Sequence, residues 1–364
     1  MTPGAVAITD WSVVSPYGLG NDAFAEGIHT ARGTVTRLDL DHWQSAEDRA
    51  CLVPGFDVRE VLGHRGTRTM DRLTGLAVAA IGELLARTGV DNDDARLAAT
   101  GLVLGTAIGS AQSTMDFIRP SYTADVPYFV DPAQMPNAAM NGVAARSAIW
   151  HRLKGPNATV AGGQAAGLHA LGYARRLLRS GHVTDVVCGG AEEYSTARSW
   201  LDHRSRGGER ATAVPGEGCA VLMLTAAENT GGSAQAELLA VHNSVCLDSD
   251  FRQSVRACLL DLLGRAGASP ADVWAAASSG DSPGAGTAEQ DVMVEVFGSE
   301  ATERVAVTEL VGDTGCASAG FQIAAILAAA AEDEAAIGKL AIVSSSDRDG
   351  TVAGALLRLR GPAC

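Results

Sequence analysis

The chain alternates short, almost uninterrupted apolar runs with longer amphipathic stretches over its whole length. Strands that are covered on both faces are nearly continuously apolar, whereas strands with one wet face alternate apolar and polar residues. The pattern therefore predicts an α/β fold around a sheet with helices on both sides. The predicted strands are 5–9, 101–106, 158–162, 185–189, 219–224, 236–241, 273–278, 304–308, 340–345 and 353–357.

Four amphipathic stretches are predicted helices, and glycine, a common helix terminator, follows three of them. They are residues 69–87, 164–179, 254–265 and 315–331. Similar numbers of strands precede and follow the sequence Gly231-Gly232-Ser233. We therefore expect two related α/β halves, residues 1–232 and 233–364, that pack closely because the linker is short.

Composition excludes several classes of function. The chain has 28 basic and 42 acidic residues, a net charge of −14, so it lacks the basic surface that nucleic acids and anionic membranes require. Its longest apolar run, 323–331, is far shorter than the ~20 residues of a membrane span. The seven cysteines show no Cys-x-x-Cys spacing, and the first residues do not resemble a secretion signal. These features predict a cytoplasmic protein with no metal and no cofactor.

The sequence Gly280-Asp281-Ser282-Pro283-Gly284 matches the Gly-x-Ser-x-Gly elbow of hydrolases. Pro283 cannot supply the backbone N–H that this elbow needs after its serine, and no histidine follows His242. An ordinary loop is therefore the better interpretation.

Residues 154–172 are more informative, because a buried strand there runs directly into a helix. The side chain at such a turn faces the helix N-terminus, where free N–H groups and the helix dipole favour a thiolate or an oxyanion. Gln164 occupies the turn. A carboxamide cannot form a thioester, so this position carries no nucleophile.

Five short segments give a more specific signal: 7–18, 70–72, 135–137, 155–157 and 215–218. Together they resemble the β-ketoacyl synthases of the thiolase superfamily, and more narrowly the chain length factors, the β-subunits of type II polyketide ketosynthases. This resemblance implies a thiolase-like fold in which the two halves form α-β-α-β-α layers.

The resemblance also implies that every catalytic position is vacant. Active relatives have a cysteine, a histidine, a lysine and a second histidine, and this chain has Gln164, Pro283, Thr308 and Asp313 there. Arg348 stands where relatives carry a gating phenylalanine. Residues 243–364 contain no histidine at all, which supports the assignment independently of any alignment. Cys316, at another helix start, is a replacement nucleophile or, more commonly for such a residue, a small buried one.

In the family resembled, the strand before the elbow pairs with its equivalent across a dimer axis. The expected interface comprises Ala158, Thr159, Val160, Ala161, Gly162 and Gly163. The expected partner is an active ketosynthase α-subunit, with a homodimer as the alternative. An acyl carrier protein would reach the pair mainly through that partner.

The resemblance further implies a substrate tunnel lined by a helix over residues 107–118. Its expected lining is Ala111, Thr114, Met115, Ile118 and Met135. These side chains are small or aliphatic, which favours a reduced or polyene product; an aromatic product stays open, and an inward-facing Phe117 would reverse the argument. The resulting hypothesis is a non-catalytic chain length factor with no independent activity. The alternative is a decarboxylase that uses Gln164 and primes synthesis from malonyl-carrier protein.

Overall fold

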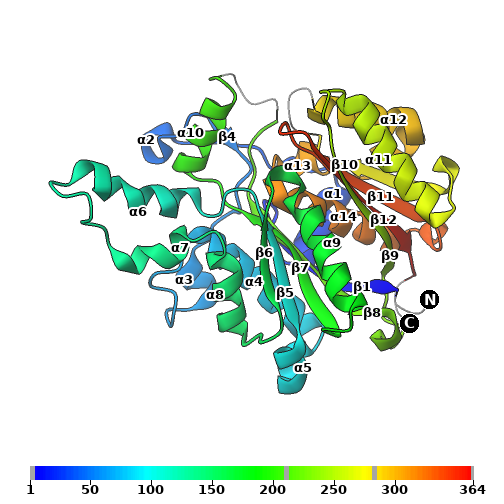
Figure 1. Cartoon of the computed structure of the whole chain (residues 1–364), viewed down its shortest axis with the longest axis horizontal. Coiled ribbons are helices and arrows are strands. Elements are labelled where there is room, and N and C mark those ends of the chain that lie inside the picture. Colours follow the sequence, from blue (N-terminus) through cyan, green and yellow to red (C-terminus); the bar gives the residue numbers. More distant parts are fainter. Residues whose placement is uncertain (1–4, 209–212, 281–284, 362–364) are drawn as a thin grey trace.

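A computed structural model describes residues 5–208, 213–280 and 285–361, and these build one large mixed sheet between layers of helices (Figure 1). The long strands are β1 (Val6–Ser15), β5 (Gly101–Thr106), β6 (Asn157–Ala161), β7 (Asp185–Glu192), β8 (Gly218–Ala226), β9 (Ala236–Val245), β10 (Val273–Ser278), β11 (Leu340–Ser346) and β12 (Thr351–Leu359). The short ones are β2 (Gly18–Leu19), β3 (Thr36–Arg37) and β4 (Arg49–Ala50).

The sheet has two parts that meet at β1. Strands from the first part of the chain follow the order β6-β5-β7-β8-β1, and those after residue 233 continue it as β9-β12-β11-β10. The junction is short, running antiparallel from Val6 opposite Leu238 to Ile8 opposite Ala236. Parallel pairs join β5 to β6 and β7, and β10 to β11; the other long strands pair antiparallel.

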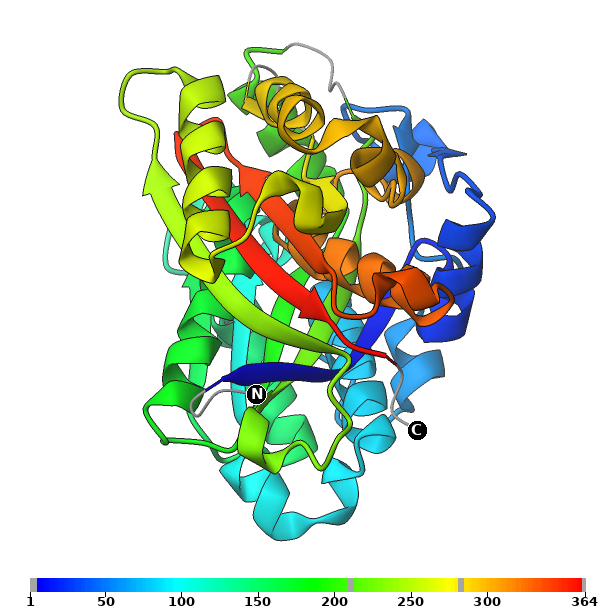
Figure 2. The ribbon, with the colours of Figure 1, turned by 90° about the vertical axis from the view of Figure 1, so that its right-hand side faces the viewer.

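The helices form three layers around the two parts of the sheet. They are α1 (Asn21–His29), α2 (Leu40–Trp43), α3 (Val58–Leu62), α4 (Arg72–Arg87), α5 (Asp94–Ala99), α6 (Ala111–Thr123), α7 (Met135–Ala138), α8 (Gly142–His151), α9 (Ala166–Arg179), α10 (Thr196–Ser205), α11 (Phe251–Ala266), α12 (Ala285–Glu303), α13 (Thr308–Val311) and α14 (Ser318–Ala331). Helices α4 and α8 cover one outer face, α11 and α12 the other (Figure 2), and α9 and α14 lie between the two parts of the sheet.

Side-chain alternation explains this layering. Val186 and Cys188 of β7 point into the central helical layer, whereas Val187 points toward α4. In the second part, Val343 of β11 enters the central layer and Ile342 packs toward α11 and α12. Both faces of each part are therefore buried, which confirms the predicted α/β fold with α-β-α-β-α layers.

The predicted strand at 304–308 is wrong. Residues 304–307 form no strand, and α13 begins at Thr308. The segment nevertheless lies beside β10, because Arg304 Nε donates to the Trp274 carbonyl at 3.0 Å and Thr308 Oγ1 donates to the Ser279 carbonyl at 3.1 Å. Side-chain hydrogen bonds to β10 and to the residue that follows it therefore hold residues 304–308 in place of the backbone pairing that a strand would make.

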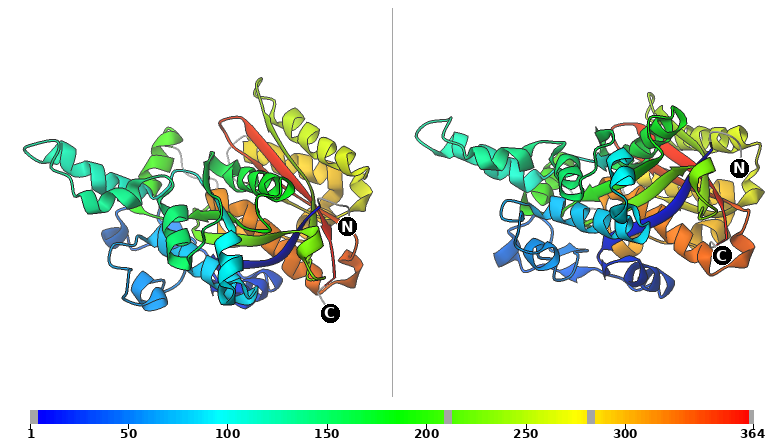
Figure 3. Two further views of the ribbon diagram at one scale, coloured as in Figure 1. Left: turned by 60° about the horizontal axis from the view of Figure 1, so that its bottom comes forward. Right: turned by 90° about the horizontal axis from the view of Figure 1, so that it is seen from below.

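Helices α6 and α7 and the connection between them form an arm that extends away from the body, as two further views show (Figure 3). The predicted helix began at residue 107, but the helix starts four residues later, at Ala111, with Ser110 as its N-cap. Among the described residues, no helix is both long and apolar enough to cross a membrane.

Candidate functional site: a vacated elbow

The turn between β6 and α9 has the geometry that the sequence predicts. Gly163 has a φ of +59°, a left-handed conformation that glycine adopts without strain. A single 3-10 turn, Gly163–Ala165, then leads into α9. This places Gln164 at the helix N-terminus, half-buried, where its backbone N–H is free of the helix ladder.

Two carboxylates from the second half of the chain hold Gln164. Its backbone N–H donates to Asp347 Oδ2 at 2.9 Å, and its side-chain Nε2 donates to Asp313 Oδ1 at 3.2 Å. The same Asp313 oxygen accepts the Gly315 N–H at 2.8 Å. The structure therefore brings the predicted positions Gln164 and Asp313 together and adds Asp347, which the sequence did not single out.

A cavity of about 260 Å³ opens above the elbow. It is lined by Ala107, Ile108, Gly163, Gln164, Arg198, Asp202, Arg206, Asp313, Gly315, Asp347, Arg348 and Asp349. Within the ranges that the structure describes, neither a thiol nor an imidazole lines it. The cavity holds the charged groups of three arginines and four aspartates, an environment unlike an acyl-binding pocket.

Arg198 is the most buried charge of this cavity, with 5% of its surface exposed. Its Nη1 donates to the carbonyl oxygens of Glu193 at 3.0 Å and Gly216 at 3.3 Å. Burial alone would lower the pKa of Arg198, but the carboxylates of Glu192, Asp202 and Asp313 outweigh it and raise that pKa. The guanidinium therefore stays charged and fixes the floor of the cavity.

The remaining positions that the resemblance singled out have different outcomes. Thr308 is half-buried, bonds the Ser279 carbonyl and does not line the cavity. Pro283 and the rest of the hydrolase-like sequence 281–284 lie outside the described residues. Arg348 lines the cavity and is exposed.

Cys316 is fully buried and is not placed to act as a nucleophile. Its thiol donates to the carbonyl oxygens of Gly105 at 3.2 Å and Ala191 at 3.5 Å. Burial first, and then the Glu192 carboxylate, raise the pKa of this thiol well above its ordinary value. A neutral, hydrogen-bonded thiol in the core is a packing residue.

The five predicted tunnel residues are distributed around the arm. Ala111 is buried, and Thr114 and Ile118 are half-buried. Met115 and Met135 are 38% and 62% exposed. The Thr114 hydroxyl donates to the Ser110 carbonyl at 2.9 Å and lies 3.5 Å from the Ala138 carbonyl, so Thr114 faces α7.

A buried carboxyl anchors the start of α6. Glu193 Oε1 accepts from the Ser110 hydroxyl at 2.9 Å, and its Oε2 accepts from the Leu73 N–H at 3.2 Å. Ser113 in turn donates to Asp71 at 3.0 Å. Burial, reinforced by the nearby Asp71 charge, raises the pKa of Glu193 to about 7. This network ties the N-terminus of α6 to that of α4.

The predicted interface strand is an edge of the sheet. Among the described strands, β6 pairs only with β5, from Asn157 opposite Leu102 to Ala161 opposite Thr106. Ala158 and Val160 pack on the central core, while Asn157 and Ala161 are exposed. The other side of the strand is thus open to a further strand.

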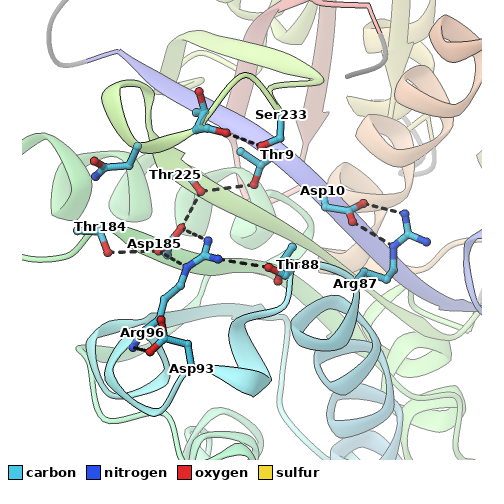
Figure 4. Close-up of a pocket in the computed structure, with 12 residues that line it drawn as sticks. Thr9, Asp10, Arg87, Thr88, Asp93, Arg96, Thr184, Asp185, Thr225 and Ser233 are labelled. Carbon is cyan, nitrogen blue, oxygen red and sulfur yellow. Dashed lines mark hydrogen bonds and ion pairs between the residues drawn. The ribbon is translucent and has the colours of Figure 1, made fainter. Parts of the chain in front are cut away.

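A second cavity, of about 590 Å³, lies between β1, β8 and the end of α4 (Figure 4). Both of its arginines pair with carboxylates: Arg87 with Asp10 at 3.1 Å and Arg96 with Asp185 at 3.0 Å. Thr225 also donates to Asp185, at 2.8 Å. The cavity is larger than the one at the elbow, but its lining includes none of the predicted site residues, so we take the elbow as the functional site.

The sequence pattern of the "Beta-ketoacyl synthase, N-terminal domain" matches residues 4–230, more than half of the chain. The chain belongs to the β-ketoacyl synthase family. A solved structure titled "The ishigamide ketosynthase/chain length factor" has a TM-score of 0.93 and 43% identity, covering 98% of this chain and 100% of that one. The predicted resemblance to type II polyketide chain length factors and the thiolase-like fold are confirmed.

Curated members of the family are more distant. The chain is 28% identical over 202 residues to "3-oxoacyl-[acyl-carrier-protein] synthase 2" of Vibrio harveyi, covering 54% of this chain and 47% of that protein. It is 30% identical over 261 residues to the "Tetracenomycin polyketide synthase ketoacyl synthase alpha subunit" of Streptomyces glaucescens, covering 64% and 61%. In the Vibrio harveyi comparison the match spans about half the length of the relative.

Proposed function

We propose that this chain is a non-catalytic chain length factor: it pairs with an active ketosynthase subunit and shapes the tunnel that limits the polyketide. One observation carries the proposal. The elbow, where the nucleophile of a condensing enzyme would stand, presents Gln164 held by Asp313 and Asp347. Carbon–carbon bond formation from thioesters needs a thiolate and a proton-transferring group, and the cavity offers neither among its described lining residues.

The proposed partner surface is β6 together with the arm. The arm and its surroundings expose large apolar side chains that a monomer would bury: Tyr122, Tyr128, Phe129, Met135 and Met140. An open edge strand beside such a surface favours an obligate partner. Because the missing thiol and imidazoles must come from elsewhere, we propose an active ketosynthase rather than a second copy of this chain. That partner would take most of the contacts with an acyl carrier protein, in the cytoplasm.

The alternative, a decarboxylase that primes synthesis from malonyl-carrier protein, is disfavoured by the charges at the elbow. Decarboxylation develops an enolate, which donors must stabilise. Here the Gln164 N–H already donates to Asp347, and Asp313 stands beside it. Both carboxylates would repel the malonyl group and the enolate. Acetyl product released by the isolated chain from malonyl-carrier protein would favour this alternative.

The tunnel proposal is tested by enlarging a side chain. Thr114→Phe, in the chain co-expressed with its ketosynthase, should shorten the products, because a phenyl ring would fill space beside α7. Gln253→Phe, at an exposed position of α11 outside the arm, serves as the control. Mass spectrometry of carrier-bound chains reads out length, and equal product distributions in both variants would remove Thr114 from the tunnel. We further propose a reduced or polyene product, because the wild-type lining is small or aliphatic.

A further inference from the structure

Asp347 occupies a hydrogen-bond donor at the elbow, which is a change separate from the loss of the nucleophile. The inference drawn from this contact rests on the proposed non-catalytic role. A backbone N–H at a helix N-terminus is a ready donor for an anion or a developing oxyanion. At this elbow the Gln164 N–H is instead occupied by a carboxylate of the chain itself, 183 residues away in sequence.

The approach of Asp347 is built into the backbone of both segments. A Cβ placed on Gly163 would lie 1.8 Å from Asp347 Oδ2, so only glycine at this position admits the carboxylate. Asp347 sits in the turn between β11 and β12, where its N–H donates to the Thr351 carbonyl at 2.8 Å and its own carbonyl accepts from Gly350 at 2.9 Å. The carboxylate is therefore held by a short, closed turn.

A buried acid fixes the strand end that precedes this turn. Glu289 is fully buried, and its Oε2 accepts from the Ser346 N–H at 3.1 Å and the Ser346 hydroxyl at 2.7 Å. It also accepts from Ser279, at the end of β10. Position 347 is thus set by the core of the second half and not by the elbow that it closes.

We propose that Asp347, supported by Asp313, closes the vacated elbow from within the chain, so that the site would stay unreactive even if a thiol were restored at position 164. Asp347 acts as a positioning residue: it takes up the N–H donor and places negative charge where a thiolate would form. Silencing therefore has two parts, the replacement of the nucleophile and the occupation of its surroundings. Reversing only the first should not recover reactivity.

The test compares thiols placed at the elbow in the full chain, co-purified with its ketosynthase. Gln164→Cys is combined with Asp347→Ala or Asp347→Asn, and Gln164→Cys with Asp349→Asn is the matched control, because Asp349 lines the same cavity from the same turn. The thiolate displaces iodide from iodoacetamide, and mass spectrometry follows the tryptic peptide 155–175, which carries no other cysteine.

In Gln164→Cys alone, adjacent carboxylates should raise the thiol pKa above the ordinary ~8.5, despite the helix N-terminus. Adding Asp347→Ala should lower the midpoint of the alkylation profile by about one pH unit and speed alkylation about tenfold at pH 7.5. Asp347→Asn should shift it in the same direction by less, since its carboxamide oxygen still accepts the N–H. If Asp347→Ala does not fold, Asp347→Asn decides the question.

Two results would overturn the proposal. One is a Gln164→Cys thiol that already titrates at or below ~8.5 and is unaffected by either substitution at position 347. The other is an equal shift from Asp349→Asn, which would assign the effect to general charge and not to the contact. Neither result would contradict the proposed non-catalytic role, because the wild-type chain carries no thiol at the elbow.

Discussion

The chain contains two elbows of the same local design, and they differ in the surroundings of the residue that follows the glycine. Gly163 and Gly315 have φ values of +59° and +53°, each starts a three-residue 3-10 turn, and each turn leads into a 14-residue helix. The residue after glycine is Gln164 in the first and Cys316 in the second. Gln164 lines a cavity, whereas Cys316 is sealed in the core.

The difference between the elbows lies in what covers them. The first follows β6, an edge strand, so its side chain faces outward between segments of the second half. The second leads into α14 in the central helical layer, and the Cys316 thiol ends against the carbonyl oxygens of Gly105 in β5 and Ala191 in β7. A cysteine at a helix start is therefore not a nucleophile by position alone; exposure and neighbouring charge decide.

We expect the greatest loss of affinity for the ketosynthase from a charge placed on β6, the edge strand that precedes the first elbow. Ala161→Arg should weaken assembly with the ketosynthase at least about 100-fold, because an unpaired charge would be buried in the proposed interface at a cost of about 3 kcal/mol. Leu260→Arg, on exposed α11 at the far side, is the control. Affinity is measured by titration of purified subunits, and equal affinity for both variants would place the interface elsewhere.

The second prediction compares the loss of stability caused by a leucine at each of the two elbows. Cys316→Leu should destabilise the chain by about 2 kcal/mol, since extra methyl groups cannot fit a packed core. Gln164→Leu should cost about 1 kcal/mol or less, because the cavity accommodates the new side chain and only one hydrogen bond is lost. Urea unfolding of both variants gives the comparison, and equal losses would show that the elbows are equally buried.

A smaller effect is expected at the end of β7, which lies beside the second elbow and anchors the arm through Glu193. Its pKa of about 7 exceeds the unfolded value, so the folded state holds this proton more tightly and its stabilising contribution is lost as pH rises. Between pH 6 and pH 7 the wild type should lose about 1 kcal/mol more stability than Glu193→Gln. Parallel pH profiles of unfolding would contradict the raised pKa.

Much of this architecture follows from sequence alone. The apolar runs at 101–106 and 273–278 are strands with those bounds, and the turn carrying Gln164 lies where the strand-to-helix pattern predicts it. The resemblance assigned Gln164 and Asp313 to two vacant catalytic positions, and in the structure these two side chains lie 3.2 Å apart. These features are local, or are carried by short motifs, so the sequence can reveal them.

Other features depend on tertiary contacts that no local pattern encodes. Val305 and Val307 predicted a strand, yet the segment lies beside β10 through the side chains of Arg304 and Thr308. The sequence did not single out Asp347, because its contact with the elbow forms only when the turn between β11 and β12 meets Gly163. Such contacts join positions far apart in the chain and require the fold to be known.

We propose that this chain, although it has the fold of a condensing enzyme, forms no thioester of its own. The direct measurement incubates the full chain, without its ketosynthase, with malonyl- and acyl-carrier protein and follows both the intact mass of the chain and the release of acetyl groups. We expect an unchanged mass and no acetyl release, with acylation appearing only on the ketosynthase when the pair is reconstituted. Acylation of the isolated chain followed by turnover would contradict it.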